Sequence, residues 1–122
     1  MSALWVWLGA GVLGALGAVA RFVMDGAIGS RVAGDMPWGT LAVNVTGALA
    51  VGVLVGAGVH GDARFLLVGG LIGSFTTFST WMFETQRLAE EGESRIALVN
   101  ILLSVALGIA AVALGWWIGA VA

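Results

Sequence analysis

The chain has 122 residues, of which 60% are hydrophobic and 10% are charged, with a net charge of -2 and a mean hydropathy of +1.05. A soluble domain of this length needs a more polar surface, so the composition predicts an all-α membrane protein. Five arginines, no lysine, no cysteine and one histidine exclude a basic nucleic-acid surface, thiol redox chemistry and a Cys/His zinc centre.

The apolar stretches predict four transmembrane helices in a single domain, residues 1–122. One bilayer crossing takes about 20 apolar residues, which places spans at about 3–25, 38–59, 65–88 and 96–120. The first span lacks the basic start and the short apolar core of a secretory signal, so we expect it to be retained.

Glycines recur at four-residue spacing within the spans, which is typical of helices whose backbones approach closely in lipid. The pairs are Gly52/Gly56, Gly69/Gly73 and Gly115/Gly119. We expect these glycines to lie at contacts between helices.

Small and hydroxylated residues interrupt the third span. The run Gly-Ser-Phe-Thr-Thr-Phe-Ser-Thr, residues 73–80, combines weak helix formers with hydroxyls that compete for backbone hydrogen bonds. It predicts a helix broken at mid-membrane depth, where freed carbonyls and hydroxyls suit a small ion. The alternative is an intact helix whose hydroxyls bond back to their own backbone.

Three further polar side chains lie within or near the spans. Asn44 must find partners in hydrocarbon, either as interhelical glue or as a donor lining a pore. Arg21, near the end of the first span, can reach the interface or stand at a pore mouth. Glu84 follows the break by one turn and can face a vestibule or an arginine.

Together these residues resemble the Fluc (CrcB-type) fluoride channel family. The matching pieces, spread over the whole chain, are residues 17–21, Gly39 and Thr40 with Asn44 and Gly47, residues 69–80 with Glu84, and more loosely Asn100 with Ser104. The Thr-Thr-Phe-Ser-Thr sequence after paired glycines is the most specific of them. Trp81 stands where the family usually has Phe.

The resemblance implies a fluoride-selective channel of the cell (inner) membrane that exports fluoride passively and relieves its toxicity. It implies an antiparallel, dual-topology homodimer with two pores and a central structural sodium ion. The implied fluoride pathway comprises Asn44, Phe78, Trp81, Thr77, Ser79, Thr80 and Ser104. The backbone carbonyls of Gly73 and Thr76 would hold the sodium, and Arg21, Thr40 and Glu84 would serve the vestibule or the structure.

Two other classes of protein remain as alternatives. A proton-coupled small multidrug-type transporter needs a carboxylate deep in its first span, and residues 3–20 contain none. A non-transporting membrane scaffold subunit would leave the polar break without a role. An enzyme is not expected, because the chain shows neither a nucleophile beside a base nor a metal cluster.

The arginines bear on the orientation of the chain. Arg31, Arg87 and Arg95 flank the first and third loops, and Arg64 alone marks the opposite side. This bias favours one orientation with both termini outside, which conflicts with dual topology. Burial of Arg87 beside Glu84 would weaken the bias, and a heterodimer with an oppositely inserted relative is the alternative to the homodimer.

Overall fold

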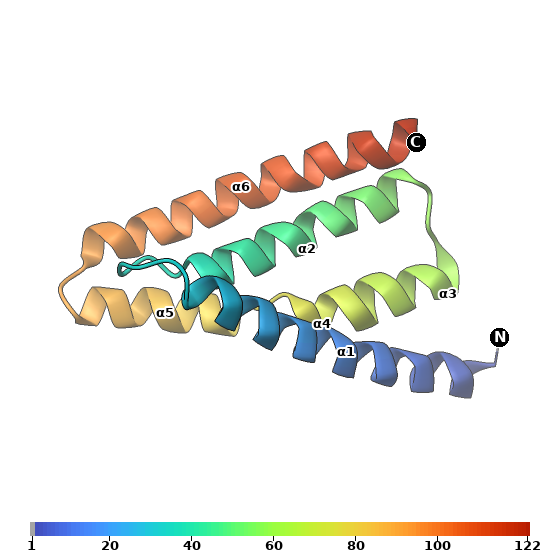
Figure 1. Cartoon of the computed structure of the whole chain (residues 1–122). Coiled ribbons are helices and arrows are strands. Elements are labelled where there is room, and N and C mark those ends of the chain that lie inside the picture. Colours follow the sequence, from blue (N-terminus) through green and yellow to red (C-terminus); the bar gives the residue numbers. More distant parts are fainter. Residues whose placement is uncertain (1) are drawn as a thin grey trace.

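The computed structural model describes residues 2–122, and every regular element in that range is helical (Figure 1). The elements, in chain order, are α1 (Ala3–Gly29), α2 (Trp38–Gly56), α3 (Gly61–Arg64), the π-helix η1 (Phe65–Ile72), α4 (Gly73–Phe75), α5 (Ser79–Glu90) and α6 (Ser94–Val121). Elements α3, η1, α4 and α5 follow one another as one helical segment, Gly61–Glu90.

Within residues 2–122, four helical segments are long and apolar enough to cross a membrane, namely α1, α2, Gly61–Glu90 and α6. The chain is therefore a multi-pass membrane protein. The predicted spans 3–25, 65–88 and 96–120 lie inside the observed helices, whereas the helix of the second ends at Gly56, before the predicted 59. Proline at position 37 directly precedes α2, where its missing N–H costs nothing.

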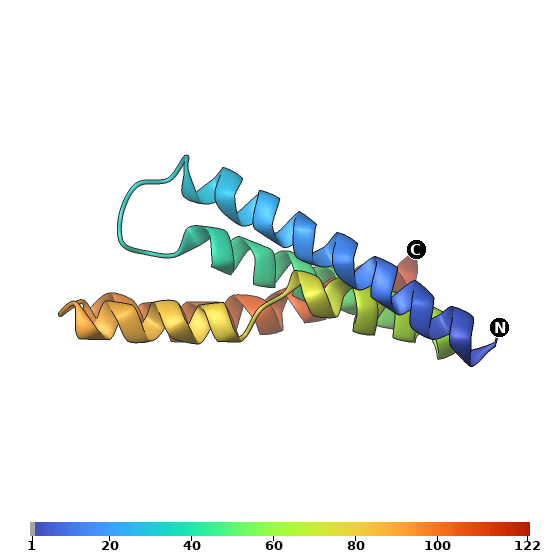
Figure 2. The same ribbon diagram turned by 90° about the horizontal axis from the view of Figure 1, so that it is seen from below.

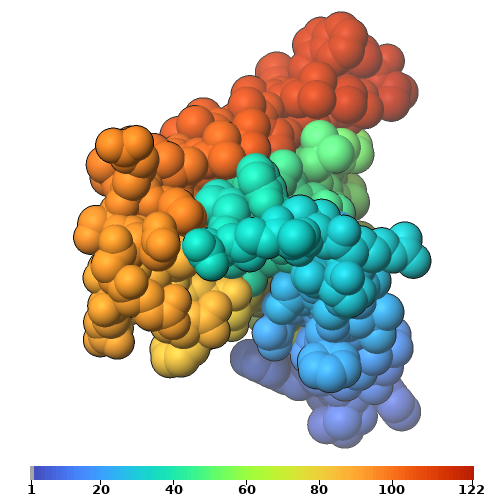
Figure 3. All heavy atoms as spheres, turned by 60° about the vertical axis from the view of Figure 1, so that its left-hand side comes forward, coloured from blue at the N-terminus to red at the C-terminus, as the bar shows by residue number. Residues whose placement is uncertain are grey.

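The four segments alternate in direction. Both termini and the connection between α2 and α3 lie at one end of the molecule, while the α1–α2 loop and the α5–α6 turn lie at the other (Figure 1). Figure 3 shows these last two connections together on the face that comes forward. Seen from below, α1 and α2 diverge toward their loop, and α5 lies beside α6 (Figure 2).

The parallel helices α2 and α6 are packed backbone against backbone through four glycines. A Cβ atom added at Gly52 would lie 2.9 Å from the amide nitrogen of Trp116, and one at Gly115 would lie 2.9 Å from that of Val53. Gly56 and Gly119 face the partner helix equally closely. The expectation for these two pairs is therefore confirmed.

Helix α1 packs on η1 and α4 in the same parallel manner, but not through the predicted glycines. Gly17 lies against the backbone of Leu71, and Gly70 lies against the backbone of Ala10. A Cβ at Gly69 or Gly73 would meet only atoms of the third segment itself, so within this chain no close approach of two helices depends on that pair. A π-helix bonds i to i+5, and its faces no longer repeat with the spacing of an α-helix.

Candidate ion-conducting site

The third segment loses its helical backbone for three residues, 76–78. Helix α4 ends at Phe75, Thr76 is extended with φ -82° and ψ 160°, and α5 begins at Ser79. The non-helical stretch is shorter than the predicted 73–80, because both flanks of that range are helical. The Thr76 hydroxyl donates to the Ile72 carbonyl at 3.1 Å, the back-bonding that the alternative interpretation expected.

Asn44 of α2 holds the non-helical stretch through two hydrogen bonds. Its Nδ2 donates to the Thr77 carbonyl at 2.9 Å, and its Oδ1 accepts from the Thr77 amide at 2.8 Å. The side chain thus replaces the helical partners of both backbone groups of Thr77. One hydrogen of its Nδ2 remains for another acceptor.

The same geometry frees two carbonyl oxygens. In a continuous helix Gly73 would accept from the Thr77 amide and Thr76 from the Thr80 amide. The Thr77 amide instead donates to Asn44, and the Thr80 amide donates to the Thr77 hydroxyl at 3.2 Å. Gly73 and Thr76 are the two residues whose carbonyls the family resemblance assigns to sodium.

Two aromatic rings lie at the end of the interruption, one on its last residue and one on the first turn of α5. Phe78 and Trp81 meet edge to face, with ring centroids 5.7 Å apart and planes at 80°. Phe78 is 71% exposed in the single chain. The indole N–H of Trp81 donates to the Asn100 carbonyl of α6 at 3.4 Å, so this donor is directed toward α6.

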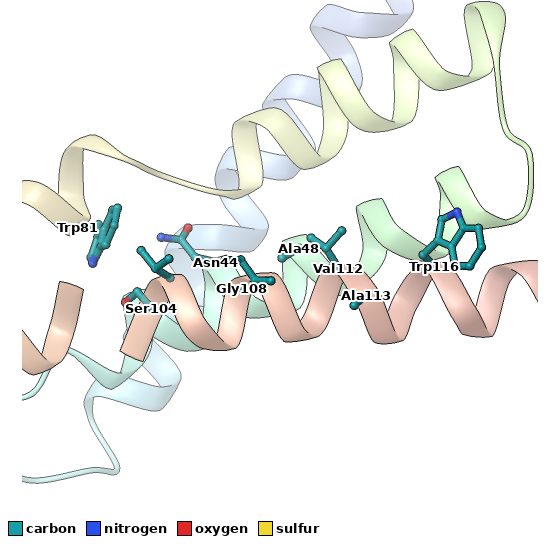
Figure 4. Close-up of a pocket in the computed structure, with 10 residues that line it drawn as sticks. Asn44, Ala48, Trp81, Ser104, Gly108, Val112, Ala113 and Trp116 are labelled. Atoms are coloured by element: carbon teal, nitrogen blue, oxygen red, sulfur yellow. The ribbon is translucent and has the colours of Figure 1, made fainter. Parts of the chain in front are cut away.

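A groove with a volume of about 730 Å³ runs from this region along α2 and α6. Figure 4 shows Trp81, Asn44 and Ser104 at one end and Trp116 at the other, with Ala48, Gly108 and Val112 between them. The polar residues thus gather at one end, and the rest of the lining is apolar. The Ser104 hydroxyl is buried and has no hydrogen-bond partner in residues 2–122.

The remaining predicted polar residues make separate contacts. The Thr40 hydroxyl donates to Glu84 Oε1 at 2.6 Å. Arg21 Nε donates to the Ser74 carbonyl at 3.3 Å. Thr77 and Ser79 share a weak hydroxyl contact at 3.5 Å.

Arg87 does not lie beside Glu84 as a buried partner. Its side chain is 55% exposed, and its Nε lies 3.8 Å from Oε1 of Glu91, the residue directly after α5. The bias of arginines toward the end with the α1–α2 loop therefore stands. The alternative of a buried Arg87 beside Glu84 is not observed, because Glu91 offers Arg87 a partner in solvent.

The structure also adds residues that the sequence did not single out. Thr85 is 8% exposed and links α5 to Asn100 of α6. Asp25 of α1 lies against Gly39 of α2, where any Cβ would overlap its carboxylate. The only indication of Thr85 in the sequence is a lone hydroxyl on an amphipathic helix. Its spacing alone does not show whether that hydroxyl is buried or solvated.

The fold and site define a small multi-pass membrane protein with a polar, non-helical stretch beside an aromatic pair. A sequence profile described as "CrcB-like protein, Camphor Resistance (CrcB)" matches residues 8–116. The chain therefore belongs to the CrcB family, which confirms the resemblance that its motifs suggested.

Relatives of the chain carry channel names. It is 48% identical to "Fluoride-specific ion channel FluC 2" of Mycobacterium bovis over 113 residues, 93% of this chain and 90% of the relative. It is 46% identical to "Fluoride-specific ion channel FluC 1" of Rubrobacter xylanophilus over 105 residues, 85% of each chain. With "Fluoride-specific ion channel FluC" of Geobacter sulfurreducens the identity is 41% over 116 residues, 91% of this chain and 90% of the relative. The family is thus one of ion channels, and this chain is not an enzyme.

Proposed function

We propose that the chain is a fluoride channel that lets fluoride leave the cell passively and so relieves its toxicity. The observation that carries this proposal is the junction of α4 and α5, where Asn44, Phe78 and Trp81 meet around residues 76–78. The names of its relatives agree with it. The junction lies within a segment long enough to span the bilayer, and we place it at mid-membrane depth.

The chemistry of the junction suits a small, strongly hydrated anion. A pathway for fluoride must replace water donors without holding the ion too tightly to release it. The spare amide hydrogen of Asn44, the positive ring edges of Phe78 and Trp81 and neutral hydroxyls can do this. The hydroxyls are those of Thr77, Ser79, Thr80 and Ser104. No lysine is present to trap the anion.

The functional unit is an antiparallel homodimer with two pores. The single chain leaves Phe78 largely exposed and the groove along α2 and α6 open, so a second copy would enclose both. The bias of Arg31, Arg87 and Arg95 to one end opposes dual topology, and a heterodimer with an oppositely inserted relative remains the alternative.

The carbonyls of Gly73 and Thr76 fit a structural sodium ion at the dimer centre. Both have lost their helical amide partners, and hard cations prefer oxygen ligands. Two carbonyls from each copy would supply the ligands without any carboxylate. Sodium would supply positive charge there, and the chain's own part is to aim the carbonyls through the Asn44–Thr77 bonds.

Charged and polar residues outside the junction would line a vestibule or support it. Thr40 and Glu84 are hydrogen-bonded to each other, and Arg21 is bonded to Ser74. A proton-coupled multidrug-type transporter is less well supported, because the carboxylate of α1, Asp25, lies only one turn from the C-terminal end of that helix. We place the protein in the cell (inner) membrane.

Efflux from liposomes tests the proposal. The purified protein should release fluoride from preloaded vesicles and retain chloride, and Phe78→Ala should lower fluoride release while the protein keeps its oligomeric state. Thr46→Val, on the exposed side of α2, is the control and should conduct normally. Vesicles that release neither ion would favour the scaffold subunit, and release that requires a proton gradient would favour the transporter.

A further inference from the structure

A buried polar cluster lies behind Trp81, on the side of the ring that faces α6. The Asn100 side chain is 1% exposed, and its Nδ2 donates to the Thr85 hydroxyl at 2.9 Å. The Thr85 hydroxyl donates to the Trp81 carbonyl at 2.8 Å. The indole N–H of Trp81 donates to the Asn100 carbonyl at 3.4 Å, which closes a ring of contacts among three residues.

The direction of each hydrogen bond in this cluster is fixed. A carbonyl only accepts, so the Thr85 hydroxyl must donate its one hydrogen to the Trp81 carbonyl. Thr85 can therefore only accept from Asn100, which requires the amide nitrogen of Asn100 to face it. Asn100 Oδ1 then points away, and it is buried without a partner in the described chain.

The same hydrogen bonds affect Ser104, which lies one turn after Asn100 in α6. A helical serine ordinarily donates to the carbonyl four residues earlier, which here belongs to Asn100. That carbonyl already accepts from the backbone amide of Ser104, as in any α-helix, and from the indole N–H of Trp81. These two hydrogen bonds use both of its lone pairs. With that carbonyl occupied, the Ser104 hydroxyl does not donate to it and has no partner in the described chain, at the polar end of the groove.

We infer that Thr85 and Asn100 are positioning residues for the ion pathway. They hold the Trp81 ring nearly perpendicular to that of Phe78 and keep the Ser104 hydroxyl free to donate to the ion. This inference rests on the proposed function, because it assigns a role relative to a fluoride pathway. Neither residue contacts the ion itself.

A matched pair of variants at position 85 tests the inference. Thr85→Val keeps the side-chain shape and removes the hydroxyl, whereas Thr85→Ser keeps the hydroxyl. The protein is labelled with 5-fluorotryptophan, and the ¹⁹F resonance of Trp81 is assigned by its loss in Trp81→Phe. Thr85→Val should shift that resonance and lower fluoride flux by roughly three- to tenfold, the range that one lost hydrogen bond gives. Thr85→Ser should leave the Trp81 resonance and the fluoride flux close to those of the unaltered protein.

A second variant and a double mutant separate positioning from general stability. Asn100→Asp keeps the shape but removes the donor to Thr85, so it should shift the same resonance even if Thr85→Val does not assemble. In a Trp81→Phe background, Thr85→Val should reduce flux less than it does alone, because the indole link to Asn100 is already absent.

The outcomes distinguish this inference from the function on which it rests. An unmoved Trp81 resonance in both Thr85→Val and Asn100→Asp would overturn the positioning role, as would an equal loss of flux in the Trp81→Phe background. Absence of fluoride flux from the unaltered protein would overturn the proposed function instead.

Discussion

Replacing Asn44 with alanine should destabilise the protein by about 2 kcal/mol. The variant leaves the amide and the carbonyl of Thr77 without the partners they now have at 2.8 and 2.9 Å. Stranding a buried polar group costs about 1–3 kcal/mol. Asn44 and Thr77 are both only partly buried, so we take the lower end for each of the two groups.

The free energy of unfolding in mixed detergent micelles measures this effect. Thr46→Val, two residues along α2 and exposed, is the matched control and should change that free energy by less than about 0.5 kcal/mol. Equal stability of the Asn44→Ala and Thr46→Val variants would refute the argument, because it would mean that the Thr77 backbone does not depend on Asn44.

A charge variant at the same position separates the structural role from conduction. Asn44→Asp retains an acceptor for the Thr77 amide but loses the donor and adds a carboxylate beside the pathway. Fluoride flux should collapse while the dimer persists. Normal flux through the Asp variant would mean that Asn44 is only a packing residue.

Other predictions concern the aromatic pair, the sodium ion, helix packing and orientation. Trp81→Phe should retain part of the fluoride flux, because the ring edge stays while the indole bond to Asn100 is lost, whereas Trp81→Ala should lower the flux further; undiminished flux in the Ala variant would assign the indole to packing. Deleting Thr76 should abolish any dependence of thermal stability on sodium, whereas Thr76→Ser should preserve it; stability that is indifferent to sodium in the unaltered protein would remove the proposed site. Gly115→Ala should destabilise the protein by about 1–3 kcal/mol through overpacking against α2, whereas Gly26→Ala, with open space around it, should not; equal stabilities would contradict the packing. A C-terminal tag should be reachable from both sides of the membrane, and access from one side only, with no partner chain present, would exclude the homodimer.

The sequence predicted those features that depend on composition and local preference. The four helical segments follow from apolar runs of bilayer length, and the presence of Gly52 and Gly56 at a helix contact follows from their spacing. Each of these can be read within a short window of the chain.

Features that depend on contacts between distant segments could not be predicted in this way. The partner of the Trp81 indole lies 19 residues away, on another helix, and that of the Asn44 amide lies 33 residues away. In the π-helix η1 the glycine that contacts α1 is Gly70, whereas the four-residue spacing had pointed to Gly69. No residue type in that run signals a π-helix. Asn44 was predicted to act either as interhelical glue or as a donor lining a pore, but its partner Thr77 could not be named from the sequence.

The close glycine packing of α2 against α6 has a consequence for biosynthesis. Helix α2 ends at Gly56, but its partner is complete only at Val121, near the end of the chain. At about 5–20 residues per second, roughly several seconds of translation separate the two. During that interval the glycine face of α2 has no helix of its own chain to cover it, whereas α1 can already pack on η1. A chain truncated inside α6 would thus leave the backbone surface of α2 uncovered in the lipid. We expect such a chain to be degraded by membrane proteases.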